Sequence, residues 1–170
     1  MIERPSENEY PEFYATYVNK VPKGDVLKYL KKQKADFKKF VEAIPEEKLS
    51  YRYEEDKWTI KQILGHINDT ERIMTYRALS FSRGERQQIP GFNENEYVAN
   101  AAFNQRKIAD LLKEFIKIRE NSVLLIDSFN EVMIDKKGNA NELLMSVRAI
   151  VYIIAGHLEH HKGVIKSKYL

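Results

Sequence analysis

The sequence has no cysteine among its 170 residues, which excludes a disulfide framework and any metal site built on thiolates. It also lacks a long hydrophobic run, because the densest apolar stretch, residues 149–155, is much shorter than the roughly 18 residues of a membrane span. An excess of one charge is missing too, since 28 basic residues nearly balance 25 acidic ones. Binding to nucleic acid needs a concentrated basic face, so we expect neither a nucleic-acid partner nor a membrane segment.

The chain begins without an apolar segment of the kind that directs secretion. Residues 1–5 include a glutamate and an arginine, so we expect no signal peptide and a cytoplasmic protein. A chain of this length corresponds to one ordinary domain and can bury a substantial core. We therefore expect residues 1–170 to form a single domain.

Apolar residues recur at helical spacing in four parts of the sequence. The predicted helices cover about residues 25–44, 59–82, 96–129 and 142–168. Asp25 and Thr59 are typical N-cap residues for the first two helices, and Pro45 would end the first. No segment shows the alternation of apolar and polar residues that is typical of a strand.

Two further segments precede or connect these helices. Residues 1–23 are rich in tyrosine, glutamate and proline, and their aromatic side chains can pack, so they predict an ordered N-terminal arm. Residues 85–95 are polar and contain the turn signal Pro90-Gly91, which predicts a crossover between the second and third helices. The expected fold is therefore an all-α four-helix bundle with this arm and this crossover.

All four histidines fall in two short stretches of the predicted helices. His157 and His161 are four residues apart, so they project from one helix face, and that face continues the inward apolar stripe. His66, on the second helix, could supply a third nitrogen. Three protein ligands with one coordination position left open are the arrangement of catalytic metal sites, and imidazole suits zinc, nickel, copper and iron.

A more ordinary interpretation stays open, because a single inward histidine is most often a hydrogen-bonded core residue. Two buried imidazoles need two sets of partners, which makes that interpretation harder for His157 and His161 together. His160 lies at the edge of the inward face and is interpreted as a flanking residue. Gly65 and Gly156, which each precede a site histidine, indicate either a close approach of the helices or a coincidence.

Asp69 is the candidate catalytic residue beside these ligands. It follows His66 by one helical turn on the same face, where its carboxylate could act as a general base or orient an imidazole. The alternative is a solvated carboxylate, since Glu71 and Arg72 close by are charged as well.

Substrate access is expected at one end of the bundle, because packed apolar stripes should close its sides. The predicted end is the one where the second helix begins and the fourth finishes. The arm and residues 51–57 are the expected covers, since the crossover leaves from the opposite end of the second helix.

Two sequence segments match motifs of a known family, in the same order and at a similar distance along the chain. They are Trp58-Thr59-Ile60-Lys61-Gln62-Ile63-Leu64-Gly65-His66-Ile67 and Ala155-Gly156-His157-Leu158-Glu159-His160-His161. The opening residues Arg4-Pro5, Glu9-Tyr10, Tyr17-Val18, Val21-Pro22 and Gly24-Asp25 agree, as do Gly91-Phe92-Asn93 and Glu96-Tyr97. Through these residues nearly the whole chain resembles the DinB-like (DinB/YfiT-type) metalloenzymes.

This resemblance implies a four-helix bundle in which three histidines hold a divalent metal ion, commonly nickel or zinc. Carried over by position, the ligands are His66, His157 and His161. Similar proteins include thiol S-transferases that use low-molecular-weight thiols, an isomerase and hydrolases, and family members often dimerise. We therefore expect a divalent metal and a small-molecule substrate, with a low-molecular-weight thiol as a candidate cosubstrate and a homodimer as a candidate assembly.

Two classes of function remain open. The first is a metal-dependent enzyme, either a thiol S-transferase or a hydrolase, in which any thiol must come from a cosubstrate because the chain has no cysteine. The second is a non-catalytic, metal-stabilised bundle that binds a ligand or takes part in a stress response. An open coordination position beside a pocket would favour the enzyme, and a closed site would favour the binding protein.

Overall fold

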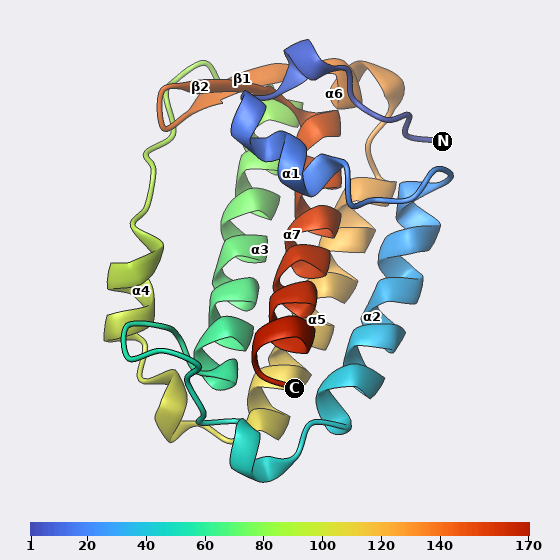
Figure 1. The fold of residues 1–170 in the computed structure, drawn as a ribbon. Helices are drawn as coiled ribbons and strands as arrows, with labels where there is room; N and C mark the ends of the chain where they lie inside the picture. Colours follow the sequence, from blue (N-terminus) through green and yellow to red (C-terminus); the bar gives the residue numbers. More distant parts are fainter.

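The computed structural model describes all 170 residues and contains four long helices packed as a bundle (Figure 1). These are α2 (Val26–Glu42), α3 (Ile60–Ser82), α5 (Ile108–Asp127) and α7 (Val147–Lys168). Both α2 and α3 pack against α5 and α7, so the helices follow one another around the bundle in the order α2, α5, α3, α7. The predicted all-α four-helix bundle is confirmed. No helix combines the length and apolar character that crossing a bilayer would require.

The predicted caps of the first two long helices are present. The Asp25 carboxylate accepts hydrogen bonds from the amides of Leu27 and Lys28 at the start of α2. Thr59 accepts from the Gln62 amide, and the Gln62 side chain accepts in return from the Thr59 amide. This capping box satisfies two otherwise unpaired backbone donors and places the start of α3 at Ile60.

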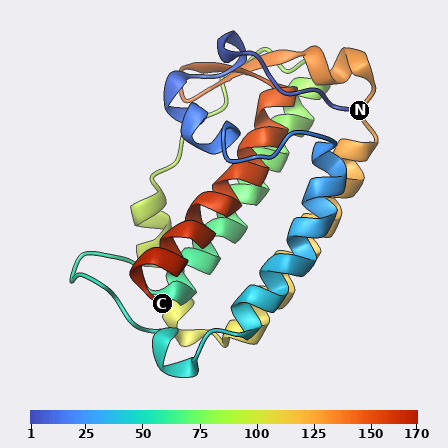
Figure 2. The ribbon, with the colours of Figure 1, turned by 45° about the vertical axis from the view of Figure 1, so that its right-hand side comes forward.

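The N-terminal arm is ordered and lies across α7 (Figure 2). It contains two short 3-10 turns, Glu7–Glu9 and Glu12–Tyr14, and the helix α1 (Ala15–Val18), which packs against α7. Arg4 donates hydrogen bonds to the carbonyl oxygens of Val18 and Val21, whose side chains are buried. The arm is therefore part of the packed structure.

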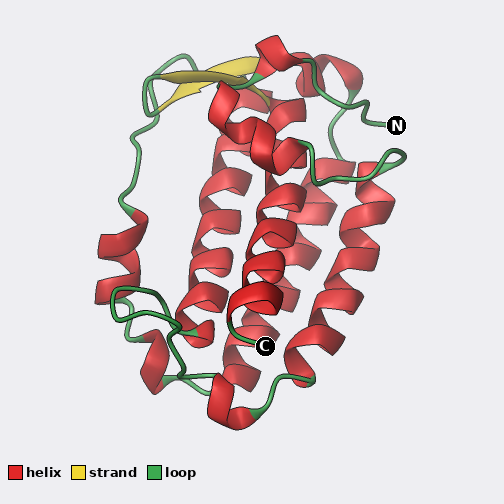
Figure 3. Cartoon of the chain, viewed as in Figure 1, coloured by secondary structure: helices red, strands yellow, loops and turns green.

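The crossover has a longer path than the sequence suggested, because α3 and α5 run in the same direction (Figures 1 and 3). The chain must return the length of the bundle between them, and it does so along the outside of α3. On the way it forms α4 (Glu94–Asn100) and a 3-10 turn, Phe103–Gln105. Asn104 then accepts a hydrogen bond from the Thr59 hydroxyl at the start of α3.

The prediction that the third long helix begins near residue 96 was wrong. Asn93 caps the separate helix α4, and Ala102 has a positive φ of 50°, which breaks the helical path. The long helix α5 starts only at Ile108. Residues 96–107 have enough apolar side chains to mimic a helical period, but the turn at Ala102 redirects the chain.

The sequence analysis also missed a β-hairpin before the fourth helix. Strands β1 (Lys137–Ala140) and β2 (Leu143–Ser146) pair antiparallel at the end of the bundle, after the short helix α6 (Glu131–Asp135) (Figure 3). Asn141 and Glu142 both have positive φ, which suits a two-residue hairpin turn. Ser146 caps α7, so the fourth helix begins at Val147 instead of near residue 142.

The apolar core is divided into two clusters of buried side chains, one toward each end of the bundle. Between them lies a polar layer formed by Gln33 of α2, Glu71 of α3 and Arg119 of α5. Arg119 is fully buried and binds both carboxylate oxygens of Glu71 at 2.7 and 2.9 Å. It also donates to the Gln33 side-chain oxygen at 2.7 Å, and Gln33 donates to the Ala155 carbonyl on α7 at 2.9 Å.

Replacing Arg119 with alanine should lower the free energy of unfolding by about 3–5 kcal/mol, because Glu71 would keep a buried charge without a partner. Denaturant unfolding measures this loss. Lys117→Ala is the matched control, since Lys117 lies on the exposed face of the same helix and forms only a surface ion pair, worth less than about 1 kcal/mol. Equal losses in the two variants would contradict a structural role for the polar layer.

Candidate metal centre

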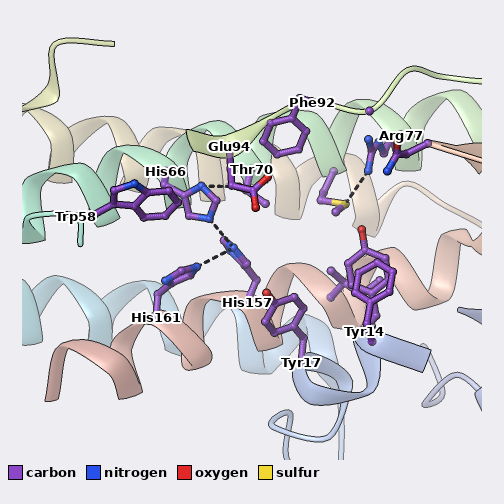
Figure 4. Close-up of a pocket in the computed structure, with 15 residues that line it drawn as sticks. Tyr14, Tyr17, Trp58, His66, Thr70, Arg77, Phe92, Glu94, His157 and His161 are labelled. Atoms are coloured by element: carbon purple, nitrogen blue, oxygen red, sulfur yellow. Dashed lines mark hydrogen bonds between the residues drawn. The ribbon is translucent and has the colours of Figure 1, made fainter. Parts of the chain in front are cut away.

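Three imidazoles meet inside the bundle, one from α3 and two from α7 (Figure 4). The Nε2 atom of His157 lies 3.0 Å from Nε2 of His66 and 3.1 Å from Nε2 of His161. Ligand nitrogens of the three residues all lie within 4.8 Å of one another. His157 and His161 come together because they are one turn apart on α7, and His66 faces them because α3 packs directly against α7.

Burial keeps these imidazoles neutral at physiological pH. It lowers the pKa of His66 to about 4, with a further contribution from His160. Burial also holds the pKa values of His157 and His161 well below the ordinary range, and the neighbouring imidazoles add to the effect. A neutral imidazole has a free lone pair on one nitrogen, which is the form that binds a metal ion.

The donor set fits a metal ion better than it fits an ordinary hydrogen-bonded core. Three nitrogens bound tetrahedrally to one ion at about 2.0–2.1 Å would lie about 3.3 Å apart, close to the two separations observed. No carboxylate or carbonyl is hydrogen-bonded to the converging nitrogens. Without an ion, three lone-pair-bearing atoms would face one another with few donors to share.

Neighbouring side chains hold the imidazoles in place. The Thr70 hydroxyl lies 3.5 Å from Nδ1 of His66, where its oxygen can accept a hydrogen bond from Nδ1–H and leave the Nε2 lone pair facing the cluster. The Trp58 ring lies 4.7 Å from the His66 ring, measured between centroids. The Tyr17 ring meets His157 edge-on at 5.4 Å. These aromatic contacts restrict water around the ligands.

A cavity of about 290 Å³ adjoins the three histidines. Its walls come from α3, α7, the N-terminal arm and the crossover (Figure 4). The lining side chains are Phe13, Tyr14, Tyr17, Trp58, His66, Thr70, Met74, Arg77, Phe92, Glu94, Asn141, Ile153, His157 and His161, together with Gly91. A small molecule in this cavity would therefore contact the imidazoles directly.

The N-terminal arm covers the cavity as expected, but this cavity does not open at the end of the bundle where access was expected. The cavity lies along the side, between α3 and α7, and it is covered by the arm and by Gly91, Phe92 and Glu94 of the crossover. The crossover reaches the site because it returns along α3. Residues 51–57 do not line this cavity, but Tyr53, Asp56 and Lys57 border a second pocket of about 560 Å³, which also reaches His161 and lies at the end where access was expected.

The comparisons with known proteins agree with this architecture. The sequence model of the DinB superfamily matches residues 29–165, which include all three histidines. The chain belongs to the DinB superfamily. A curated protein of Oceanobacillus iheyensis, named "putative metal-dependent hydrolase", is 28% identical over 127 residues, covering 74% of this chain and 73% of that protein.

A solved structure has a similar fold. It is YfiT from Bacillus subtilis, which is described as "a probable metal-dependent hydrolase with an unusual four-helix bundle topology". The TM-score is 0.75 over 83% of this chain and 82% of YfiT, at 14% sequence identity. At that identity the likeness concerns the fold alone.

Asp69 does not line the cavity of this DinB-superfamily chain. Its half-buried carboxylate pairs with Arg72 at 3.5 Å, and burial raises its pKa while Arg72 opposes the rise and Glu114 adds to it. These neighbours belong to the α3–α5 side of the bundle, away from α7. The carboxylate that does line the cavity is Glu94, which the sequence analysis did not select.

His160 occupies the flanking position that the sequence predicted. Its ring packs edge-on against His161 at 5.0 Å and against Tyr17 at 5.3 Å, but it does not join the three converging nitrogens. The two glycines do not bring α3 and α7 together; each leaves room for another segment of the chain. A Cβ at Gly156 would overlap the backbone carbonyl of Tyr17, and one at Gly65 would overlap the Phe103 ring.

Thr70 and Arg77 are lining residues that sequence reasoning missed. A signal for them was present, because His66, Thr70, Met74 and Arg77 follow one another at intervals of four, four and three residues on one face of α3. Tyr17 and Glu94 had no such signal, since they lie in the short helices α1 and α4, outside the four long helices that the sequence predicted.

His157→Ala should abolish binding of one metal ion per chain, because it removes the central nitrogen of the cluster. Elemental analysis after loading with zinc or nickel and desalting measures the content. His160→Ala is the matched control on the same helix and should retain the ion. Full metal content in the His157 variant would show that this cluster is not the site.

Gly156→Ala should detach the N-terminal arm, because the added Cβ collides with the Tyr17 backbone. We expect faster proteolysis within residues 1–23 and a lower melting temperature. Gly163→Ala on the same helix is the control, since nothing lies within 4 Å of its Cβ, and its higher helix propensity should stabilise the protein by up to about 1 kcal/mol. Identical behaviour of the two variants would contradict the proposed close contact.

Proposed function

We propose that this protein is a metal-dependent hydrolase that acts on a small molecule bound in the side cavity. The main support is that the Nε2 atoms of His66, His157 and His161 converge at the wall of a cavity of about 290 Å³. The name of the curated relative, a putative metal-dependent hydrolase, supports the same reaction class. A cavity beside the histidines favours an enzyme over a bundle in which a closed metal site only stabilises the fold, because an enzyme needs space for a substrate next to its ion.

His66, His157 and His161 would hold a divalent ion through Nε2, and zinc or nickel suits three neutral imidazoles. When bound, such an ion supplies Lewis-acid activation of a water, a thiol or a substrate carbonyl. Thr70 would favour the His66 tautomer with its proton on Nδ1 by accepting a hydrogen bond from Nδ1–H, which leaves Nε2 free to bind the ion. Trp58 and Tyr17 pack against the imidazoles and limit the water around them.

Glu94 is the proton acceptor that we assign to the reaction. It is the one carboxylate among the fifteen residues that line the cavity. It lies at the start of α4, where the returning crossover brings it over Thr70 and the histidines (Figure 4). An exposed carboxylate at the cavity can take a proton from a reacting water and release it to solvent.

The reaction class can be tested with chromogenic nitrophenyl esters and the purified protein loaded with zinc or nickel. Release of nitrophenol that requires the metal and no added thiol is the expected result. Turnover that appears only when cysteine or another small thiol is added would identify a thiol S-transferase instead. A metal-loaded protein that binds these esters without any turnover would identify a binding protein.

Glu94→Gln should lower turnover by about 10²- to 10⁴-fold while leaving metal content unchanged, because the amide cannot accept the proton. Asp69→Asn is the matched comparison and should keep nearly full activity, since the carboxylate of Asp69 pairs with Arg72 away from the cavity. Kinetics of both variants on the active ester decide between the two carboxylates. A loss confined to the Asp69 variant would return the catalytic role to that residue.

A further inference from the structure

A single cationic side chain lines the cavity at some distance from the histidines. Arg77 lies on α3 three turns beyond His66, which corresponds to about 16 Å along the helix axis. Its side chain is only 3% exposed, and Figure 4 shows it at the opposite end of the cavity from the three imidazoles. Nothing in the proposed hydrolysis uses this residue.

Arg77 has no carboxylate partner. One terminal nitrogen donates to the Pro90 carbonyl oxygen at 3.3 Å, and the other approaches the Met74 sulfur at 3.9 Å. Its Nε atom is buried and makes no hydrogen bond. The other buried arginine, Arg119, binds both oxygens of Glu71, so the same bundle does pair a buried guanidinium where no ligand is needed.

The absence of a partner carries an energetic cost that a ligand can remove. A buried charge without an opposite charge is strongly unfavourable, and an unbonded buried N–H donor adds to that cost. A guanidinium offers its Nε–H together with a terminal N–H as a planar pair of donors, which matches two oxygens of a carboxylate or a phosphate. An anion from the substrate would satisfy both the charge and the free donor.

Tyr14 extends the same end of the cavity. Burial raises the pKa of its hydroxyl, and the charge of Arg77 and a side-chain hydrogen bond with Arg77 only partly oppose that rise, so the phenol stays protonated and can donate a hydrogen bond. Tyr14 comes from the N-terminal arm, and Arg77 comes from α3. The docked arm therefore completes this end of the cavity.

We propose that Arg77 and Tyr14 form a subsite for a compact anionic group, a carboxylate or a phosphate, carried by the substrate. The inference rests on the proposed function only in placing the reacting bond at the histidine end. It identifies the substrate class as an elongated molecule with its scissile group at one end and an anion at the other.

Binding of simple probes tests the subsite without any catalytic assay. Hexanoate should bind the metal-loaded protein at least about tenfold more tightly than its neutral analogue hexanamide, measured by calorimetry or by NMR titration. Hexyl phosphate, measured in parallel, tells which of the two anions fits better. Equal binding of all three probes would overturn the proposal.

Variants of two arginines on α3 test whether Arg77 causes the preference for hexanoate over hexanamide. Arg77→Met keeps the volume but removes the charge, so hexanoate and hexanamide should bind it within about twofold of each other. Arg72→Met, on the exposed side of the same helix, should keep the full preference. If Arg77→Met does not fold, the Nε–H resonance of Arg77 in the unaltered protein must shift on addition of hexanoate, and an unchanged resonance would overturn the proposal.

His157→Ala separates this inference from the proposed function. That variant should lose the metal and still prefer hexanoate, because the anion binds to Arg77 and not to the ion. Loss of the preference together with the metal would overturn the subsite. A preserved preference in a protein that hydrolyses no ester would leave the subsite standing and refute the hydrolase alone.

Discussion

The buried ion pair between Arg119 and Glu71 holds the helices in the arrangement on which the site depends. A guanidinium that binds both oxygens of a carboxylate tolerates little rotation or sliding of its helices, because any shift would leave a charge uncompensated in the core. Gln33 extends the contact to the Ala155 carbonyl, two residues before His157. The network of Gln33, Glu71 and Arg119 therefore fixes the position of His157 along α7 relative to His66 on α3, although none of these three residues lines the cavity.

The shared direction of α3 and α5 explains why a closed bundle has a site along its side. Two parallel helices that follow one another in sequence need a connection as long as the helices themselves. Here that connection passes over α3, and the arm lies over α7 (Figures 1 and 2). The cavity forms where the crossover and the N-terminal arm cover α3 and α7, the helices that supply the histidines. Rigid helices thus hold the three histidines, and the covering segments shape the cavity beside them.

The cavity has two chemically different ends. At one end three neutral imidazoles converge, and at the other a buried guanidinium lacks an anion. Under the proposed function, the substrate reacts at the histidine end and its anionic group binds at the Arg77 end. Binding energy from that remote group can then position the reacting bond. Helix α3 contributes both His66 and Arg77, so the spacing between these two residues is as rigid as three turns of helix.

The sequence by itself determined the four amphipathic helices, two of their caps and the pairing of His157 with His161, because helical periodicity and capping depend on neighbours a few residues apart. It also indicated the DinB-like resemblance. It could not reveal that residues 137–146 form a hairpin, since two positive-φ residues, Asn141 and Glu142, make the turn without the usual glycine. Only the tertiary structure decided which carboxylate reaches the cavity. Asp69 has the better sequence spacing, yet Glu94 lines the cavity because the crossover must return along α3, and that path depends on helix directions that no local pattern encodes.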